Sequence, residues 1–234
     1  MSAASPWPDP RALALLGVEL PIVQSPMAGF AFGELAIAVA KAGGLGSLAC
    51  ASLSPERLRT EWGSIRKATT RPINLNFFCH APPPREPERE AAWQARLSPY
   101  FAELGLDASV PRTAPGRAPF DEATCDLVCE LAPEIVSFHF GLPDEALVAR
   151  LRKASIKLLS SATTVAEARW LEDHGCDAII AQGFEAGGHR ASFLSIDRAA
   201  VHGEARARVP SVATQVGTFA LVPQVVDAVR LPVI

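Results

Sequence analysis

Polar residues and a pair of glycines follow an apolar run in the last third of this sequence. The run reads IIAQGFEAGGHR over residues 179–190 and carries Gln182, Gly187, Gly188 and His189. A glycine pair beside polar side chains lets the backbone approach a partner closely, because no Cβ stands in the way. That partner is a phosphate, a flavin, a substrate or the chain itself in a tight turn, and this pattern alone does not choose among them.

The other apolar runs also end in residues that can bind a ligand or take part in a reaction. Those at the ends of the expected strands are Ser25, Pro26, Met27, Ser47, Asn76, His139, Ser160, Ser161 and Gln182. Asparagine, histidine and glutamine at the mouth of an apolar barrel give a cavity a few directional polar groups, which is typical of a cofactor and substrate pocket. Two plainer roles stay open here: Asn76 as the cap of a loop, and Gln182 as a partner for backbone groups.

His139 lies between two phenylalanines in the run VSFHFG, residues 136–141. Because successive side chains of a strand point to opposite faces, Phe138 and Phe140 are expected on one face and His139 on the other. A desolvated imidazole stays neutral near pH 7, which suits a proton acceptor. The plainer alternative is a histidine that only packs in the core.

His189 is the second candidate for a base. It follows the glycine pair, and its neighbour Arg190 offers several N–H donors to an anion. The plainer alternative is a loop histidine bonded to nearby backbone. The remaining histidines, His80, His174 and His202, fall in expected loops or on a helix face and are predicted to be solvated.

The cysteines are odd in number and widely scattered, at Cys50, Cys79, Cys125, Cys129 and Cys176. Cys125 and Cys129 stand four residues apart on an expected helix and have the spacing of half a metal site. No matching pair of histidines or cysteines stands nearby, so this pair is predicted to be buried thiols and no metal site is predicted.

The composition is that of an ordinary globular protein. Of 234 residues, 49% are hydrophobic and 20% are charged, and the formal net charge is −3. This allows a sizeable core, and without a basic stripe nucleic acid is not an expected partner. No run of about 18 apolar residues occurs, so no membrane span is predicted. Residues 1–17 do not read as a signal peptide, and a cytoplasmic protein with reduced thiols is expected.

Short apolar runs alternate with helical stretches along the chain. The seven expected strands lie within residues 21–29, 45–51, 72–78, 134–141, 156–164, 177–183 and 231–234. The expected helices lie within residues 34–44, 54–69, 88–105, 143–154 and 165–175. Ser54 is a plausible N-cap with Pro55 at the first helical position, and Gly175 is placed to close the last of these helices.

Strands that are apolar on both faces and alternate with helices predict a parallel sheet covered by helices. Seven similar units favour an incomplete TIM (β/α)8-type barrel with about seven of its eight strands, in one domain over residues 1–234. Insertions are expected at about 79–130 and 191–215, each following a strand, where a barrel builds its active-site rim. The alternative is a doubly wound sheet, but the run GGLGSLAC does not match the G-x-G-x-x-G spacing.

Six stretches together are similar to one enzyme family. They are PIVQSPMAGF, AGGLGSLACASLSPERL, RPINLNFF, VSFHFGLP, SSATTVAEARWLEDHGCDAIIAQGFEAGGHR and QVGTFALVPQVVDAVRLPVI. They resemble the nitronate monooxygenases, formerly called 2-nitropropane dioxygenases, from about Leu20 to Ile234. The segment AQGFEAGGHR after the sixth expected strand is the most specific part of the resemblance.

The resemblance implies an FMN-dependent TIM barrel that oxidises alkyl nitronates, and often nitroalkanes, with O2 to a carbonyl compound and nitrite. It implies that His139 is the base that removes the α-proton of a nitroalkane. It also implies that Asn76, Gln182 and Gly187 contact FMN, and that the turn with Met27 lies against the flavin ring. Gly188 and His189 would line the same pocket.

Two departures from the family pattern set further expectations. The segment after PMAG reads FAFGE instead of a small polar cluster, which makes the lip over the flavin more apolar. The family continues past the final LPVI with loops that hold the phosphate, so the chain is expected to be C-terminally truncated. Two alternative functions are a related flavin-barrel reductase that uses NAD(P)H on enoyl thioesters or quinones, and a truncated product without catalysis.

Overall fold

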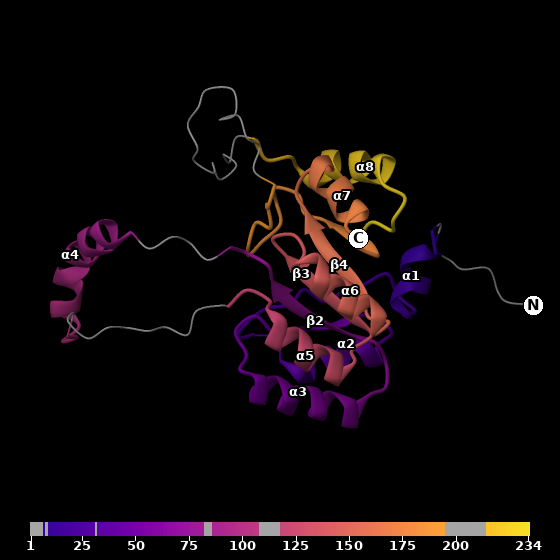
Figure 1. Ribbon diagram of the computed structural model, residues 1–234, viewed down its shortest axis with the longest axis horizontal. Coiled ribbons are helices and arrows are strands. Elements are labelled where there is room, and N and C mark those ends of the chain that lie inside the picture. The colour runs from indigo at the N-terminus through magenta and orange to yellow at the C-terminus, as the bar shows by residue number, and fades with distance from the viewer. Residues whose placement is uncertain (1–6, 8, 31, 82–85, 108–117, 195–213) are drawn as a thin grey trace, which may run out of the picture.

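A parallel β-sheet forms the centre of the protein in the computed structural model, which describes residues 7, 9–30, 32–81, 86–107, 118–194 and 214–234 (Figure 1). Its strands are β1 (Gly46–Ala49), β2 (Ile73–Phe78), β3 (Ile135–His139), β4 (Lys157–Ala162) and β5 (Ala178–Ala181). They are hydrogen-bonded in the order β1-β2-β3-β4-β5, and every neighbouring pair is parallel. The predicted α/β class with a parallel sheet is therefore confirmed.

The count of seven strands was too high for the described part of the chain. The first and last expected strands each contribute a single bridge, Val23 with Leu45 and Val233 with Ile179, both parallel. These bridges continue the sequential order at both edges of the sheet. A doubly wound sheet reverses its strand order at a switch point, and the described strands show no such reversal.

Helices lie between and beside the strands, and all but α1 and α4 cover the outer face of the sheet. They are α1 (Arg11–Leu16), α2 (Gly33–Lys41), α3 (Pro55–Ala68), α4 (Pro87–Glu103), α5 (Glu122–Leu131), α6 (Glu145–Lys153), α7 (Val165–Asp173) and α8 (Thr218–Ala228). The predicted start of α3 is confirmed, because Ser54 Oγ accepts a hydrogen bond from the Arg57 amide and Pro55 is the first helical residue. Helix α7 has His174 as its C-cap, and Gly175 follows with a φ of 95°. In the described part of the chain, no helix is long and apolar enough to cross a membrane.

The outward faces of the strands form the larger part of the core. Leu48, Phe138 and Leu158 point away from the centre of the curved sheet and pack with helix residues such as Ile65 and Leu151. A second cluster joins β5 to α7 and α8. Burial of these apolar side chains is the main favourable term in folding, and it fixes which strand positions must face inward.

The inward faces start with a smaller apolar cluster at the amino ends of the strands. Leu45, Ile135, Leu159 and Ala178 meet there, and Leu16 of α1 closes the cluster from below. Residues from both edges of the sheet, Val23 and Ile234 among them, pack against the same cluster. The sheet therefore curls around this apolar cluster, here called the dry floor. The inward positions further along each strand lie on the carboxyl-end side of the dry floor.

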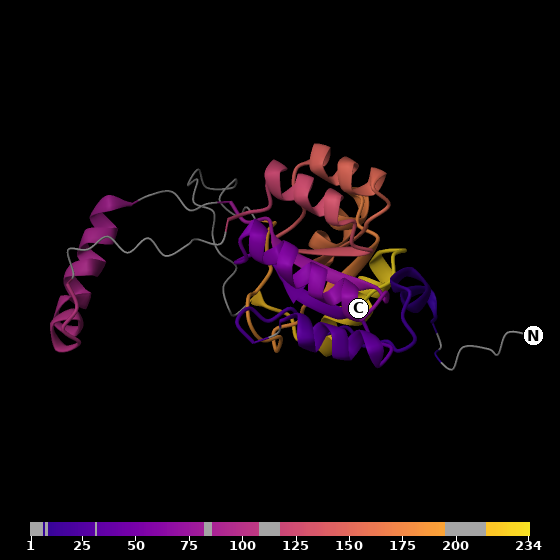
Figure 2. The same cartoon turned by 90° about the horizontal axis from the view of Figure 1, so that it is seen from below.

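Helix α4 differs from the other helices because none of its residues is buried. It stands apart from the sheet in both views (Figure 1, Figure 2). Its residues Trp93 and Tyr100 are exposed. Helix α5, which also falls within the predicted insertion at 79–130, instead packs Cys125 and Val128 into the core. Of the predicted insertion at 191–215, residues 195–213 lie outside the described residues.

Two glycines provide a matched test of this packing. A Cβ on Gly46 of β1 would lie 2.1 Å from the backbone oxygen of Ala36 in α2, whereas a Cβ on Gly63 of α3 would meet nothing within 4 Å. Gly46→Ala is expected to lower the free energy of unfolding by about 1–3 kcal/mol or more, because strand and helix must separate. Gly63→Ala is expected to raise it by about 0.5–1 kcal/mol, because alanine favours the helix.

Urea unfolding of both variants beside the unchanged protein measures these effects. Equal stability of the two variants would show that α2 does not pack on β1 as closely as described.

Candidate active site

A cavity of about 630 Å³ opens above the dry floor, at the carboxyl ends of the strands. Its walls include the turn at residues 23–28, the inward side chains of β2 and β3, and the segment of residues 186–189. Its volume falls within the range of small-molecule sites, about 300–1,000 Å³. The cavity is therefore the place where the strand-end residues can act together.

The structure brings together all seven residues to which the family resemblance assigns a role in the site. The residues that line this one cavity include Met27, Asn76, His139, Gln182, Gly187, Gly188 and His189. They come from segments separated by up to 162 positions in the chain, and the parallel strands place them at one edge. Of the serine pair at the end of β4, only Ser161 lines the cavity, whereas Ser160 Oγ donates to the backbone oxygens of Phe138 and Gly141.

His139 is the last residue of β3 and is half-buried at the cavity wall. Its Nδ1 lies 2.9 Å from Ser161 Oγ. Burial, with a smaller contribution from the neighbouring His189, lowers the pKa of His139 to about 4, so the imidazole is neutral near pH 7. When Nδ1 carries the proton and donates it to Ser161, the lone pair resides on Nε2, and the ring can accept a proton there.

The backbone turns sharply directly after His139. Phe140 has a φ of 68°, which is unusual for a residue with a side chain, and Gly141 follows at 89°. The expectation that Phe140 points away together with Phe138 is therefore wrong. Its ring lies 5.5 Å from the ring of Phe78 and 6.2 Å from that of His189, between centroids. The rings of Phe78 and Phe140 also lie beside the imidazole of His139, at 5.7 and 6.2 Å between centroids, and contribute to its burial.

A network of polar side chains lies between the dry floor and His139. Gln24 Nε2 donates to Ser47 O at 3.0 Å, and Gln24 Oε1 accepts from the Ser47 amide at 3.2 Å. Asn74 Nδ2 donates to Ser47 Oγ and to Ser137 Oγ, at 3.1 and 2.9 Å. Asn76 Nδ2 donates to Ser137 O and Oγ, at 3.2 and 2.9 Å. Sequence reasoning found Asn76 but missed Asn74, although the spacing of two residues on β2 puts both on the inward face.

Gln182 uses its carboxamide on the backbone of the segment that follows it. Its Nε2 donates to His189 O, and its Oε1 accepts from the Ala191 amide, both at 2.8 Å. Arg190 Nη1 in turn donates to Gln182 O at 3.3 Å. Gly188 has a φ of 76°, a conformation that glycine adopts without strain. Gln182 therefore fixes the shape of the glycine segment as well as lining the cavity.

Glu167 in the first turn of α7 binds the backbone that follows the glycine segment, a contact that sequence reasoning missed. The residue is 1% exposed. Oε2 accepts from the amide and the hydroxyl of Thr163, both at 2.7 Å, and Oε1 accepts from the amides of Phe193 and Leu194. The order Thr164-x-x-Glu167 is a capping-box signal for the helix start, but the signal does not reveal the bonds to residues 193 and 194.

His80 is not solvated as predicted. It is half-buried, its ring centroid lies 6.2 Å from that of Phe78, and its Nδ1 is buried without a hydrogen-bond partner among the described residues. His174 is exposed and stacks on Trp170 at 3.9 Å between ring centroids. His202 lies outside the described residues.

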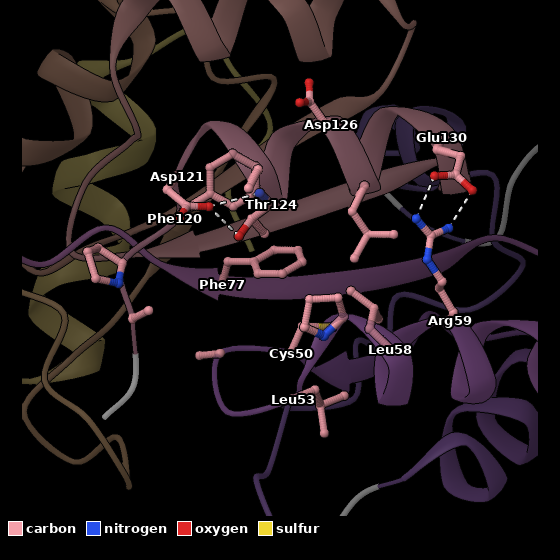
Figure 3. A pocket seen from close by; sticks show the side chains of 16 residues that line it. Cys50, Leu53, Leu58, Arg59, Phe77, Phe120, Asp121, Thr124, Asp126 and Glu130 are labelled. Atoms are coloured by element: carbon pink, nitrogen blue, oxygen red, sulfur yellow. Dashed lines mark hydrogen bonds and ion pairs between the residues drawn. The ribbon is translucent and has the colours of Figure 1, made fainter. Parts of the chain in front are cut away.

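A second cavity of about 380 Å³ lies between α3 and α5 on the outside of the sheet (Figure 3). Its charged lining residues already have partners: Arg59 pairs with Glu130, and Asp121 accepts from Thr124. Burial raises the pKa of the Cys50 thiol far above its usual range, so this thiol is no nucleophile at neutral pH. The cavity above the floor is therefore the better candidate for chemistry. The described residues hold no group of three or more side chains placed to bind a metal ion.

Comparison with known proteins finds relatives along almost the whole chain. The family model described as nitronate monooxygenase matches residues 9–234. A nitronate monooxygenase of Paraburkholderia phytofirmans is 40% identical over 229 residues, which are 95% of this chain and 57% of that protein. A nitronate monooxygenase of Pseudomonas aeruginosa is 42% identical over 184 residues, which are 78% of this chain and 52% of that protein.

Solved structures are similar over the same extent. A nitroalkane oxidase from Streptomyces ansochromogenes superposes with a TM-score of 0.78 at 34% identity, over 95% of this chain and 59% of that one. A mutant FabK from Thermotoga maritima superposes with a TM-score of 0.64 at 25% identity, over 95% of this chain and 55% of that one. The chain spans between about half and three fifths of the length of these relatives.

The lowered pKa of His139 predicts a pH dependence of stability. An unfolded histidine has a pKa of about 6.5, and His139 in the folded protein has a pKa of about 4. Between these values the unfolded chain binds a proton that the folded protein does not, so stability falls as the pH is lowered from about 6.5 to about 4. The loss is at most about 1.4 kcal/mol per pH unit.

Denaturant unfolding at pH 7.5, 6 and 5 measures this slope for the unchanged protein and for His139→Asn. The variant is expected to lose less stability on acidification. An identical slope in both proteins would contradict the burial of a neutral imidazole at this position.

Proposed function

The chain belongs to the nitronate monooxygenase family, and from this premise we propose that it takes part in the FMN-dependent oxidation of alkyl nitronates and nitroalkanes by O2. The products are a carbonyl compound and nitrite. One observation carries the proposal: a neutral imidazole, His139, held by Ser161, faces the same cavity as the glycine segment at residues 187–188. The substrates are small molecules, and such a cavity is of a size to admit them together with a cofactor.

We propose that the five strands and the two bridging segments form part of the wall of a TIM (β/α)8-type barrel, in a single domain over residues 1–234. The sequential parallel order and the inner cluster shared by both edges support this. The position of the cavity supports it too, because active sites of such barrels lie at the carboxyl ends of the strands. The insertions at about 79–130 and 191–215 would build the rim of this barrel.

FMN fits the chemistry of this cavity. A flavin site needs an apolar slot with a few polar groups and glycines where the backbone comes close. Gly187 and Gly188 have open space where a Cβ would stand. The residues proposed to hold the cofactor are Met27, Asn76, Gln182, Gly187, Gly188 and His189. Bound FMN would supply the redox chemistry by taking an electron from the nitronate.

The protein's own contribution is to place and hold a proton acceptor. His139 Nε2 takes the α-proton of a neutral nitroalkane while Nδ1–H donates to Ser161 Oγ. The resulting imidazolium is disfavoured by burial until the nitronate anion forms beside it, so the ion pair stabilises both products of the proton transfer. A substrate supplied as the nitronate has already lost this proton and does not need the base.

This mechanism predicts that loss of the base slows the reaction of a neutral nitroalkane but not the reaction of its nitronate. His139→Asn is expected to slow nitrite release from nitroethane about 10²–10⁴-fold, because general-base catalysis is lost. Nitrite release from ethyl nitronate is expected to stay within a few-fold of the unchanged protein. The assay is nitrite formation under air with FMN supplied, with each substrate form added freshly.

His174→Asn is the matched control, because it removes an exposed imidazole that stacks on Trp170 away from the cavity. It is expected to leave both rates unchanged. An equal loss on both substrate forms in His139→Asn would contradict the role of His139 as the base. If the unchanged protein consumed NAD(P)H without releasing nitrite, the flavin-barrel reductase would be the better assignment.

A further inference from the structure

Asn74 lies beside the cavity of the candidate active site and has a side-chain oxygen without a hydrogen-bond partner among the described residues. The residue is 2% exposed and lies among the residues that line the cavity. Both hydrogens of its Nδ2 are used, one on Ser47 Oγ and one on Ser137 Oγ. Its Oδ1 is buried and has no hydrogen-bond partner among the described residues. An unmatched buried acceptor is destabilising, and native proteins rarely keep one without a use.

The position of Asn74 limits what can supply the missing donor. Asn74, Asn76 and Phe78 all line the cavity, as the inward residues of β2. On β3, Asn74 pairs in register with Ile135 of the floor cluster, whereas Asn76 pairs with Ser137, so Asn74 lies one layer deeper, toward the floor. The neighbouring Ser47 amide and the Gln24 carboxamide are already bonded to each other. The donor must therefore come from an occupant of the cavity that reaches its deep end.

Two neighbouring groups that bond Asn74 hold its amide plane in place. Ser47 Oγ and Ser137 Oγ belong to the strands on either side of β2, so the Asn74 side chain is fixed before a ligand arrives. A fixed acceptor at the end of an apolar slot suits the polar edge of a planar heterocycle that carries an N–H. The oxidised flavin ring has one such N–H, the imide N3–H.

We propose that Asn74 Oδ1 accepts a hydrogen bond from the imide N3–H of the flavin ring, which makes Asn74 a cofactor-contacting residue below Asn76. This inference rests on the proposed function, because it requires FMN in the cavity. It adds a recognition element to the residues already proposed to hold FMN.

A flavin without this hydrogen tests the contact directly. In 3-methyl-FMN a methyl group replaces the N3 hydrogen. The dissociation constants of FMN and 3-methyl-FMN are measured by quenching of flavin fluorescence with the full chain. The unchanged protein is expected to bind 3-methyl-FMN about tenfold or more weakly, because the acceptor stays unmatched and the methyl group meets it.

Asn74→Ala removes the acceptor and makes room, so this variant is expected to bind the two flavins with affinities within about twofold. Ser47→Ala is the matched control, because it removes one bond to Asn74 Nδ2 and leaves Oδ1 in place. It is expected to keep the tenfold preference for FMN.

Three outcomes would overturn the inference. A ratio near one in the unchanged protein does so without any variant. A preference for FMN that persists in Asn74→Ala, or in Asn74→Ser if the alanine variant does not fold, shows that another residue meets N3. If the unchanged protein binds neither flavin, the proposed function itself fails, and this result is distinct from binding without discrimination.

Discussion

The two-residue alternation of the strands is the constraint on which the rest of this structure depends. Outward side chains such as Phe138 must pack under the helices, so the residues between them are forced inward. The inward residues of β3 are Ile135, Ser137 and His139, which are in turn apolar, polar and titratable. One strand thus contributes to the dry floor, to the polar network and to the site, and a shift of one residue would destroy all three together.

Sequence patterns predicted the parts of the protein that depend on local rules. The start of α3 followed from Ser54 and Pro55, because a cap needs only its neighbouring residues. The gathering of Met27, His139 and Gln182 at one cavity followed from their place at strand ends, since parallel strands end at a common edge. The edge strands were overestimated, because an apolar run does not reveal how many residues find a pairing partner.

Contacts across the chain were the parts that sequence patterns could not supply. Phe140 was placed on the wrong face, because no local preference announces a left-handed backbone at a phenylalanine. His80 was predicted to be solvated, but its ring contacts that of Phe78 at the end of β2 and that of Phe140 after β3. Gln182 was expected at the cavity, but its bonds to His189 and Ala191 depend on how the glycine segment folds back.

The buried carboxylate of Glu167 joins the start of α7 to the segment that follows the glycine pair. Its four donors are the amide and hydroxyl of Thr163 and the amides of Phe193 and Leu194. Gln182 holds the near end of the same segment through His189 and Ala191. Glu167 does not line the cavity, so a change at this residue would reach the ligand-facing glycines through the backbone alone.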